Sequence, residues 1–321
     1  MTISVIIPGY NNPERWWRRC VESILSSGAD EIVCIDDGSA DKPRFLEDYP
    51  SVRVVYLEKN VGLAAARNAA LEYVTGDYVT FLDSDDEVEP DTFRQCKRRL
   101  DATQSDVAVY GVKVIWPEDG LMKVDIPSRA IEGRPLLPDD IRDLSESCLL
   151  NYSCNKVYRK KFLDAHNLRF DKKGMPCEDI IFNLNVILAG ARFCTVDSPG
   201  YVYYRTRGTL LSRYKNTSDA GMRLASETWR KYKVAVVDAR KALGDMGEVS
   251  EAQLQNAAWR NAWMPGTPYS LLQRWRMRPG KAFFKMMIFM LLRRHFYFRP
   301  IRRWNTRRNY PHVVDWHGRW P

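Results

Sequence analysis

The sequence predicts an α/β fold: a mixed, mainly parallel sheet flanked by helices, followed by a C-terminal helical extension. Two observations predict it. In the first third of the chain, short apolar runs alternate with amphipathic segments at the spacing of repeated βαβ units. Beyond about Tyr214 the pattern becomes helical, with few strand signals. At 321 residues the chain has room for a main domain, expected over residues 1–214, and an extension over residues 215–321.

The elements of the first third follow from their apolar patterns. "ISVIIP", "EIVCIDD", "VRVVYL" and "DYVTFLD" each have the pattern of a buried strand. A helix is predicted over residues 13–26, and an Ala-rich helix over "GLAAARNAALEYVTG", ended by Gly76. The expected apolar face of the first helix comprises Trp17, Val21, Ile24 and Leu25.

The middle of the chain is less regular. "SDVAVYGVKVIW" predicts one strand, residues 138–150 a helix, and "CNKVYRKKFLDAHNLRF" a strand followed by a helix. A further helix is expected to start at Glu178 and Asp179. "RFCTVDSPGYVYYRTRG" predicts two more strands.

Composition excludes several classes of protein. The seven scattered cysteines include no CxxC pair, which argues against a disulfide framework or a zinc knuckle and is typical of a reducing compartment. The N-terminus lacks the features of a secretory signal, so we expect a cytoplasmic protein. The four histidines lie outside every motif, which argues against histidine catalysis. No GxGxxG follows the first strand and no GxxxxGK[ST] occurs, so dinucleotide and P-loop sites lack their phosphate cradles.

Charge is distributed unevenly along the chain. Residues 270–321 carry thirteen Lys or Arg and a single acid, whereas residues 1–269 carry 36 basic and 39 acidic side chains. Residues 282–292 form an apolar run broken only by Lys285, far shorter than the ~20 residues that a membrane span needs. Basic flanks with Phe, Tyr and Trp favour a helix lying on an anionic membrane surface, and a helix packed on the main domain is the alternative. Since no nucleic-acid-binding fold accompanies the basic residues, we expect no nucleic-acid partner.

Three predicted strands end in residues that could bind a ligand. The first ends at Pro8-Gly9-Tyr10, the second at Asp36-Asp37-Gly38-Ser39 and the third at Asp83-Ser84-Asp85-Asp86. Ligands of parallel α/β sheets bind outside the carboxyl ends of the strands, so we expect the three loops to meet at one edge. The acids of "YVTFLDSDDEVEP" repel one another, and a bound cation among them would relieve that repulsion.

These motifs resemble, in order and spacing, the inverting glycosyltransferases of family two, which have the Rossmann-like GT-A-type fold. The similar segments are "SVIIPGYNN", "VCIDDGSAD", "EKNVGLAAARNAAL", "YVTFLDSDDEVEPD" and "NKVYRKKF…EDIIF", so the resemblance covers about residues 1–210. It implies a nucleotide-sugar half over residues 1–115 and an acceptor half over residues 116–214. Residues 215–321 carry no recognisable motif.

The resemblance implies a UDP-sugar donor held with Mn²⁺ or Mg²⁺. Carboxylate oxygens are the ligands that these cations prefer. Asp85 is the expected metal ligand, and Asp83 is expected to bind the ribose or a metal-bound water. Asp37 is expected to accept the imide N–H of uracil. The remaining nucleotide contacts are assigned to Pro8 and Tyr10 at the base, and to Arg67 and Arg205 at the diphosphate.

Inverting transfer also needs a base that takes the proton of the acceptor hydroxyl. By resemblance Asp179 is that base, and Glu178 orients either the base or the acceptor. Acids at the start of a helix also interact favourably with its dipole, which is the structural alternative. Asn155 and Lys156 match the "NK" pair that shapes the acceptor side in similar enzymes.

The sequence therefore predicts an inverting, metal-dependent glycosyltransferase that moves a sugar from a UDP-sugar to a hydroxyl of a glycan acceptor. A lipid-linked acceptor in surface polysaccharide biosynthesis is expected, with residues 270–321 holding the protein on the cytoplasmic face of the membrane. Two alternatives stay open: a nucleotidyltransferase that makes a sugar nucleotide, and a non-catalytic membrane-associated binding protein. The first normally has a Gly-rich, Arg-containing loop after its first strand, and "PGYNNPERW" is not one.

Overall fold

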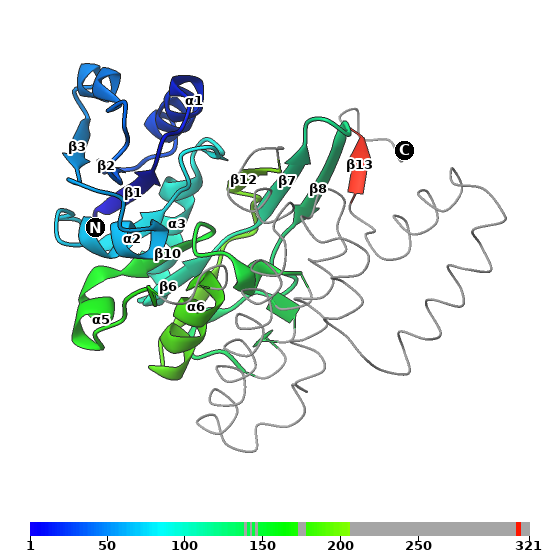
Figure 1. The fold of residues 1–321 in the computed structure, drawn as a ribbon. Helices are drawn as coiled ribbons and strands as arrows, with labels where there is room; N and C mark the ends of the chain where they lie inside the picture. Colours follow the sequence, from blue (N-terminus) through cyan, green and yellow to red (C-terminus); the bar gives the residue numbers. More distant parts are fainter. Residues whose placement is uncertain (138–139, 142, 145–146, 173–177, 206–312, 316–321) are drawn as a thin grey trace, which may run out of the picture.

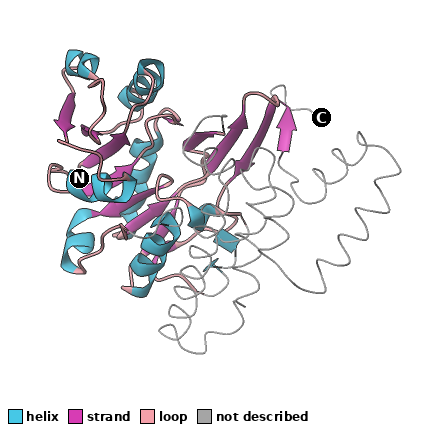
Figure 2. Cartoon of the chain, viewed as in Figure 1, coloured by secondary structure: helices cyan, strands magenta, loops and turns pink. Residues whose placement is uncertain are grey.

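The computed structural model describes residues 1–137, 140–141, 143–144, 147–172, 178–205 and 313–315. These residues form two sheets with flanking helices (Figure 1 and Figure 2). The larger sheet has eight described strands and the smaller has five. The predicted α/β class is confirmed, and the smaller sheet is a feature that the sequence analysis did not anticipate.

The larger sheet has the strand order β3-β2-β1-β4-β10-β6-β11-β9. The pairs β1–β2, β1–β4, β2–β3 and β6–β11 are parallel, whereas β10 runs antiparallel to both its neighbours and β9 runs antiparallel to β11. The sheet is therefore mixed and mainly parallel, as predicted. Its strands are β1 (Ile3–Gly9), β2 (Glu31–Asp36), β3 (Val52–Tyr56), β4 (Tyr78–Phe81), β6 (Val107–Val109), β9 (Glu132–Arg134), β10 (Lys156–Arg159) and β11 (Phe193–Thr195).

The centre of this sheet is the core of the domain. Every residue of β1 and of β4 is buried. Because successive side chains of a strand point to opposite faces, a strand buried along its whole length has both faces of its sheet covered. The helices that flank the sheet are α1 (Glu14–Leu25), α2 (Leu63–Ala70), α3 (Thr92–Thr103), α5 (Lys160–Ala165) and α6 (Glu178–Leu188), with 3₁₀ turns η1 (Arg44–Asp48) and η2 (Leu149–Asn151).

Two details of the helices differ from the sequence analysis. The buried face of α1 includes Cys20, and Leu25 is 52% exposed, so its assignment to the apolar face was wrong. Helix α2 ends at Ala70 and does not reach Gly76. The backbone N–H of Gly76 instead donates to the Ser4 hydroxyl at 2.9 Å, which fixes the chain in a turn before β4.

The smaller sheet has the order β13-β8-β7-β12-β5. It shows that the single strand predicted from "SDVAVYGVKVIW" was wrong, because the chain leaves the first sheet after β6 and enters the second as β7. Gly111 lies at this crossing, where a Cβ atom would be only 2.5 Å from the Asp125 carbonyl oxygen. The strands are β5 (Glu87–Val88), β7 (Val112–Trp116), β8 (Leu121–Asp125), β12 (Tyr201–Tyr204) and β13 (Val313–Asp315).

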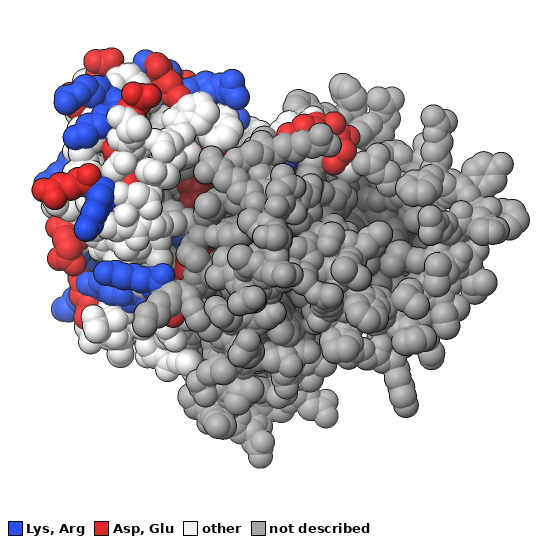
Figure 3. Space-filling view, in the orientation of Figure 1, with Lys and Arg blue, Asp and Glu red and all other residues white. Residues whose placement is uncertain are grey.

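The predicted helix over residues 138–150 lies partly outside the described residues, and those described at 140–141 and 143–144 are helical. Of the predicted extension, residues 215–321, only 313–315 are described, and they form a strand that pairs with β8. The predicted membrane-surface segment, 282–292, lies outside the described residues. Each helix in the described part of the chain is too short or too polar to cross a bilayer. On the visible face of the main domain, basic and acidic side chains are interspersed (Figure 3), in line with the near-balanced charge of residues 1–269.

Candidate active site

The ends of β1, β2 and β4 meet at one edge of the larger sheet, as predicted. The parallel register places Gly9 beside Asp36 and Ile6 beside Phe81. The following loops are joined by hydrogen bonds: the Asn11 backbone N–H donates to the Ser39 hydroxyl at 2.8 Å. The amide of Asn12 donates to the hydroxyl of Ser84 at 2.5 Å. We call these three loops the donor edge.

Asp37 is held by the chain that leads into α2. Its carboxylate accepts the backbone N–H of Val61 at 2.7 Å and of Gly62 at 2.9 Å, and the Asn60 amide at 3.0 Å. Gly62 has φ +88°, a conformation that favours glycine. Burial raises the pKa of Asp37, and the two backbone N–H groups oppose that rise.

The chain segments bonded to Asp37 carry two exposed side chains that would suit the predicted base pocket. Its backbone N–H donates to the Gly9 carbonyl at 2.8 Å, which places Asp37 next to the chain at Tyr10. Tyr10 is 42% exposed and Val61 is 44% exposed, so an aromatic and an aliphatic side chain border this part of the edge. Pro8 is buried within β1.

Asp83 and Asp85 follow β4 directly. Burial, and then the neighbouring Asp83 carboxylate, raise the pKa of Asp85 to about 6. The described residues contain no group of three or more His, Cys, Asp or Glu side chains arranged around a metal position. Mg²⁺ and Mn²⁺ commonly bind through one or two carboxylates together with substrate phosphates and waters. Two carboxylates at the end of a rigid strand therefore fit such a cation in the presence of a diphosphate.

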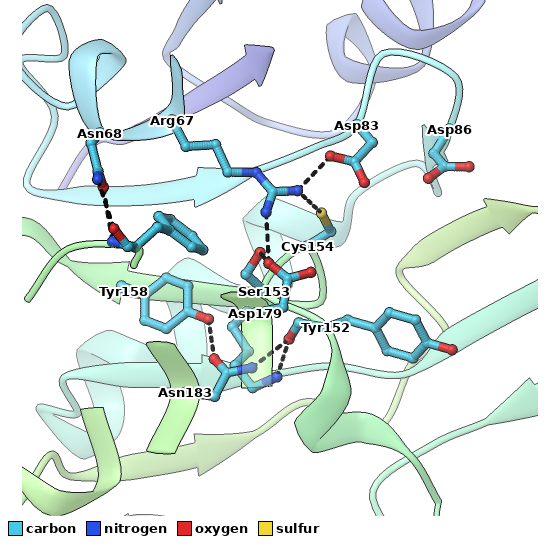
Figure 4. A network of polar contacts seen from close by, with 12 residues as sticks. Arg67, Asn68, Asp83, Asp86, Tyr152, Ser153, Cys154, Tyr158, Asp179 and Asn183 are labelled. Atoms are coloured by element: carbon cyan, nitrogen blue, oxygen red, sulfur yellow. Dashed lines mark hydrogen bonds and ion pairs between the residues drawn. The ribbon is translucent and has the colours of Figure 1, made fainter. Parts of the chain in front are cut away.

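The third acid of this loop, Asp86, has a different role. It is buried, and its carboxylate accepts the Tyr201 hydroxyl and, at 2.8 Å, the Tyr204 backbone N–H. In Figure 4 it lies beyond Asp83, on the side away from Arg67. Asp86 therefore ties the loop to β12 rather than facing the candidate cation position.

Arg19 of α1 holds the same loop from the other side. Its guanidinium donates to the Asp85 carbonyl, forms an ion pair with Glu87 at 2.9 Å, and lies 3.9 Å from the centre of the Tyr204 ring. The loop that carries Asp83 and Asp85 is thus fixed by α1 and β12 together.

Arg67 connects the donor edge to α6. Its guanidinium is fully buried and pairs with Asp83 at 2.6 Å through Nη2 and with Asp179 at 2.6 Å through Nη1 (Figure 4). It also lies 5.1 Å from the centre of the Phe170 ring. The structure thus brings two acids that are 96 positions apart in the sequence onto one cation.

Asp179 lies in the first turn of α6, as predicted. Its Oδ1 accepts the Arg67 guanidinium and, at 2.7 Å, the hydroxyl of Ser153. Among the described residues, no hydrogen bond reaches Oδ2. One oxygen of Asp179 is therefore fixed by two donors, and the other is available to accept a proton.

Glu178 precedes Asp179 and is 5% exposed. Its Oε2 is buried without a hydrogen-bond partner among the described residues. Burial, and then the Asp179 carboxylate, raise the pKa of Glu178 to about 8. Glu178 is therefore expected to be protonated at neutral pH, unlike an ordinary surface glutamate.

Comparison with known proteins identifies the family. Residues 4–166, half of the chain, match the profile of glycosyl transferase family 2. The chain belongs to this family. The resemblance found in the sequence analysis is therefore confirmed.

Relatives in this family come from several bacteria. The glycosyltransferase EpsH of Bacillus subtilis is 30% identical over 233 residues, which cover 69% of this chain and 66% of EpsH. The succinoglycan biosynthesis protein ExoO of Rhizobium meliloti is 29% identical over 219 residues, which cover 65% of this chain and 62% of ExoO. The chain thus spans just under two thirds of the length of these relatives.

Solved structures confirm the fold. The crystal structure of Staphylococcus aureus TarS in complex with UDP is similar with a TM-score of 0.58 and 20% identity, covering 90% of this chain and 78% of that chain. The TarS complex with UDP-GlcNAc has a TM-score of 0.57 and 21% identity, covering 81% and 80%. The GT-A-type fold predicted from the sequence is thereby confirmed.

Two predicted residues of this family 2 protein make no hydrogen bond or ion pair to Arg67, Asp83 or Asp179 in the described residues. Arg205 follows β12, and its guanidinium packs 5.4 Å from the centre of the Tyr203 ring, with Nη1 buried and without a hydrogen-bond partner among the described residues. Lys156 is buried at the start of β10 beside Asn155. The expected diphosphate contact of Arg205 stays a prediction.

Sequence reasoning missed the immediate neighbours of the two acids. The hydroxyl of Ser153 contacts Asp179, the Cys154 sulfur lies 3.9 Å from Nη2 of Arg67, and Asn68 pairs with the backbone of Phe170 beneath Arg67. Arg67 is enclosed between two carboxylates, and its expected contact with the diphosphate stays a prediction. The position of Ser153 and Cys154 directly before the "NK" pair was the available signal.

Proposed function

We propose that the protein transfers a sugar from a UDP-sugar to a hydroxyl of a glycan acceptor, with inversion at the anomeric carbon. One observation carries the proposal: Arg67 holds Asp83 of the donor edge and Asp179 of α6 within 2.6 Å of a single guanidinium. In this proposal the nucleotide-sugar site and the proton acceptor are adjacent, which single-step displacement requires.

On the donor side, Asp83 and Asp85 are the residues that would hold Mn²⁺ or Mg²⁺ with the donor diphosphate. When bound, the cation neutralises the negative charge that develops on the departing diphosphate. Asp37, which is hydrogen-bonded to the backbone at Gly9 and Val61, is the residue proposed to accept the uracil imide N–H. The TarS complexes with UDP and with UDP-GlcNAc support a uridine nucleotide as donor.

On the acceptor side, Asp179 is the proposed base. Its Oδ2 takes the proton of the acceptor hydroxyl as that oxygen bonds to the anomeric carbon and the bond to the diphosphate breaks. Oδ1 is already occupied by Arg67 and Ser153, so the carboxylate presents a defined oxygen to the acceptor. A single displacement of this kind converts an α-linked donor into a β-linked product.

The acceptor is proposed to be a lipid-linked glycan of a surface polysaccharide. Two observations support this: ExoO is named for succinoglycan biosynthesis, and residues 270–321 carry thirteen basic side chains with many aromatics. Such a segment suits the anionic cytoplasmic face of a membrane, where lipid carriers are accessible.

A panel of nucleotide sugars tests the donor. Thermal denaturation of the full chain is followed with each compound, with and without Mn²⁺, because a ligand that binds the folded state raises the transition temperature. We expect one UDP-sugar to stabilise the protein and to do so only with Mn²⁺. Stabilisation by no uridine nucleotide in either condition would falsify the donor assignment.

Membrane association is tested by co-sedimentation with vesicles. The full chain is expected to sediment with phosphatidylglycerol vesicles and not with phosphatidylcholine vesicles. A variant with Arg293, Arg294, Arg302 and Arg303 changed to Gln should remain in the supernatant. If the wild type and the variant sediment equally, these basic residues of the extension do not form the membrane contact.

A further inference from the structure

A short segment, residues 149–155, comprises η2 and the turn that leads into β10, and it carries Ser153, the hydrogen-bond partner of Asp179. We call it the acceptor segment. It folds around a single buried ammonium group, that of Lys156, which is 1% exposed. The Nζ donates to the carbonyl of Leu149 at 2.7 Å, to the carbonyl of Tyr152 at 2.5 Å and to Oδ1 of Asn155 at 2.8 Å. All three N–H groups of the ammonium are thus used within the segment.

Helix α6 holds the same segment from its other side. The Asn183 amide donates to the carbonyls of Leu150 at 2.7 Å and Tyr152 at 3.0 Å, and its Oδ1 accepts the Tyr158 hydroxyl at 2.7 Å. Asn183 lies four residues after Asp179, so both side chains project from one face of α6. The acceptor segment is therefore attached to α6 at two points (Figure 4). Asn183 of the helix donates to its carbonyls, and its Ser153 donates to Asp179 of the helix.

A lysine at this position is costly for the fold. Burial of an ammonium group costs several kcal/mol unless hydrogen bonds and charge compensate for it. β10 pairs with β4 and β6 on either side, an environment in which an apolar side chain meets the needs of the strand. The Nζ of Lys156 donates hydrogen bonds only to the acceptor segment. The buried charge therefore maintains the shape of that segment.

The charge state of Lys156 is linked to its surroundings. Burial lowers the pKa of Lys156 to about 7, and the carboxylate of Asp179 on α6 opposes this. The other titratable group facing it is the Cys154 thiol, whose pKa burial raises, so that it stays neutral. Three acceptors require three N–H groups, and the complete set of hydrogen bonds exists only while the amine is protonated.

We propose that Lys156 is a positioning residue for the base: it shapes the acceptor segment so that the Ser153 hydroxyl occupies Oδ1 of Asp179 and Oδ2 faces the acceptor. The inference rests on the proposed function, because it assumes that Asp179 is the base. The Nζ of Lys156 and the hydroxyl of Ser153 make no hydrogen bond to the donor edge in the described residues, so their removal should change the transfer step and leave donor binding intact.

The test compares Ser153→Ala, Lys156→Met and the double variant in the transfer assay. Each single variant should lower kcat by about 10- to 100-fold with the donor KM changed less than about twofold. The double variant should be no worse than Lys156→Met alone, because both changes break the same connection. Ser153→Thr, which keeps the hydroxyl, should recover most of the activity. The matched control is Lys160→Met on α5, whose Nζ pairs with Asp164 at 2.7 Å on the surface, and it should behave as wild type.

A pH profile adds a readout that a purely structural lysine would not change. The kcat of the wild type should fall as pH rises above about 7, where Lys156 loses its proton, and this fall should be absent in Lys156→Met. Unchanged kcat in both single variants, or additive losses in the double variant, would overturn the inference.

Three further outcomes are decisive. If Lys156→Met does not fold, Lys156→Gln replaces it, and failure of both to fold assigns the lysine to the fold and overturns the inference. Weaker stabilisation by UDP in Ser153→Ala overturns it as well. If the wild type itself transfers no sugar, the proposed function fails and the inference fails with it, whereas an active wild type with fully active variants removes the inference alone.

Discussion

Asp37 at the donor edge and Asp179 on the acceptor side are held in different ways. At the donor edge, Asp37 accepts hydrogen bonds mainly from backbone N–H groups of the neighbouring loop. On the acceptor side, Asp179 is held by the side chains of Arg67 and Ser153, which come from α2 and the acceptor segment. Backbone groups are positioned by strand register and turn geometry, whereas side-chain contacts depend on the packing of distant elements. The acceptor side should therefore be the more sensitive of the two to single substitutions.

Arg67 belongs to both regions, and its loss should have the largest effect. Arg67→Met removes both ion pairs and leaves two partly buried carboxylates facing each other, which we expect to lower the free energy of unfolding by about 2 to 4 kcal/mol. Transfer should be lost as well, because neither acid keeps its position. Urea denaturation and the transfer assay measure the two effects. Arg53→Met is the control, since Arg53 is exposed, lies 5.1 Å from the centre of the Tyr73 ring and donates to the Tyr73 carbonyl at 3.0 Å without pairing with an acid in the described residues. Equal destabilisation by both substitutions would contradict the bridging role of Arg67.

The contrast between the regions also explains what the sequence could predict. The donor edge was predicted because Pro8, Asp37 and Asp83 each end a strand with a clear apolar pattern, and parallel pairing brings strand ends together. The acid at the start of α6 was predicted from the "ED" pair. Its partner Ser153 lies 26 positions earlier and reaches it only through packing, so the place of Ser153 before the "NK" pair was the one local signal.

The sheet crossing at Gly111 was missed for a similar reason. "SDVAVYGVKVIW" has continuous strand character, and nothing local to it shows that β6 and β7 belong to different sheets. The close approach of the Asp125 carbonyl that requires glycine there exists only once β8 has folded back onto β7. The role of Asp86 depends in the same way on β12, whose residues lie more than a hundred positions away.

The two acids on Arg67 should separate donor binding from chemistry. Asp83→Asn weakens the cation site, so stabilisation by UDP with Mn²⁺ should be lost. Asp179→Asn should keep that stabilisation and lower kcat by about 10²- to 10⁴-fold, the usual contribution of a general base. Thermal denaturation with UDP and Mn²⁺, alongside UDP release with acceptor, distinguishes them. Asp101→Asn, an exposed acid of α3, is the matched control; loss of UDP stabilisation in Asp179→Asn would place that residue in the donor site.

The raised pKa of Glu178 predicts how the free energy of unfolding depends on pH. Its pKa is raised from 4.5 to about 8, so the folded state holds a proton that the unfolded state releases above about 4.5. The resulting stabilisation is complete below pH 4.5 and is lost as pH rises through 8. Relative to Glu178→Gln, the wild type should therefore lose about 2 to 4 kcal/mol of unfolding free energy between pH 5 and pH 8.5.

Urea denaturation at these two pH values measures that difference. The exposed Glu58, changed to Gln, serves as the control and should show the same pH dependence as the wild type. If Glu178→Gln also follows the wild type across this range, the glutamate is ionised throughout and its buried oxygen has a partner.

Tyr201 tests the support of the donor edge from β12, with the smallest expected effect. Its hydroxyl donates to the buried carboxylate of Asp86, so Tyr201→Phe leaves that acid with only the Tyr204 backbone N–H as donor. We expect a loss of about 1 to 3 kcal/mol in unfolding free energy, the usual cost of an unsatisfied buried polar group. Because Asp86 fixes the loop that carries Asp85, the apparent affinity for Mn²⁺ with UDP should also fall. The control is Tyr73→Phe, at an exposed tyrosine, and calorimetry measures the binding of Mn²⁺ with UDP to both variants. If both bind Mn²⁺ as the wild type does, β12 supports the fold and does not set the cation site.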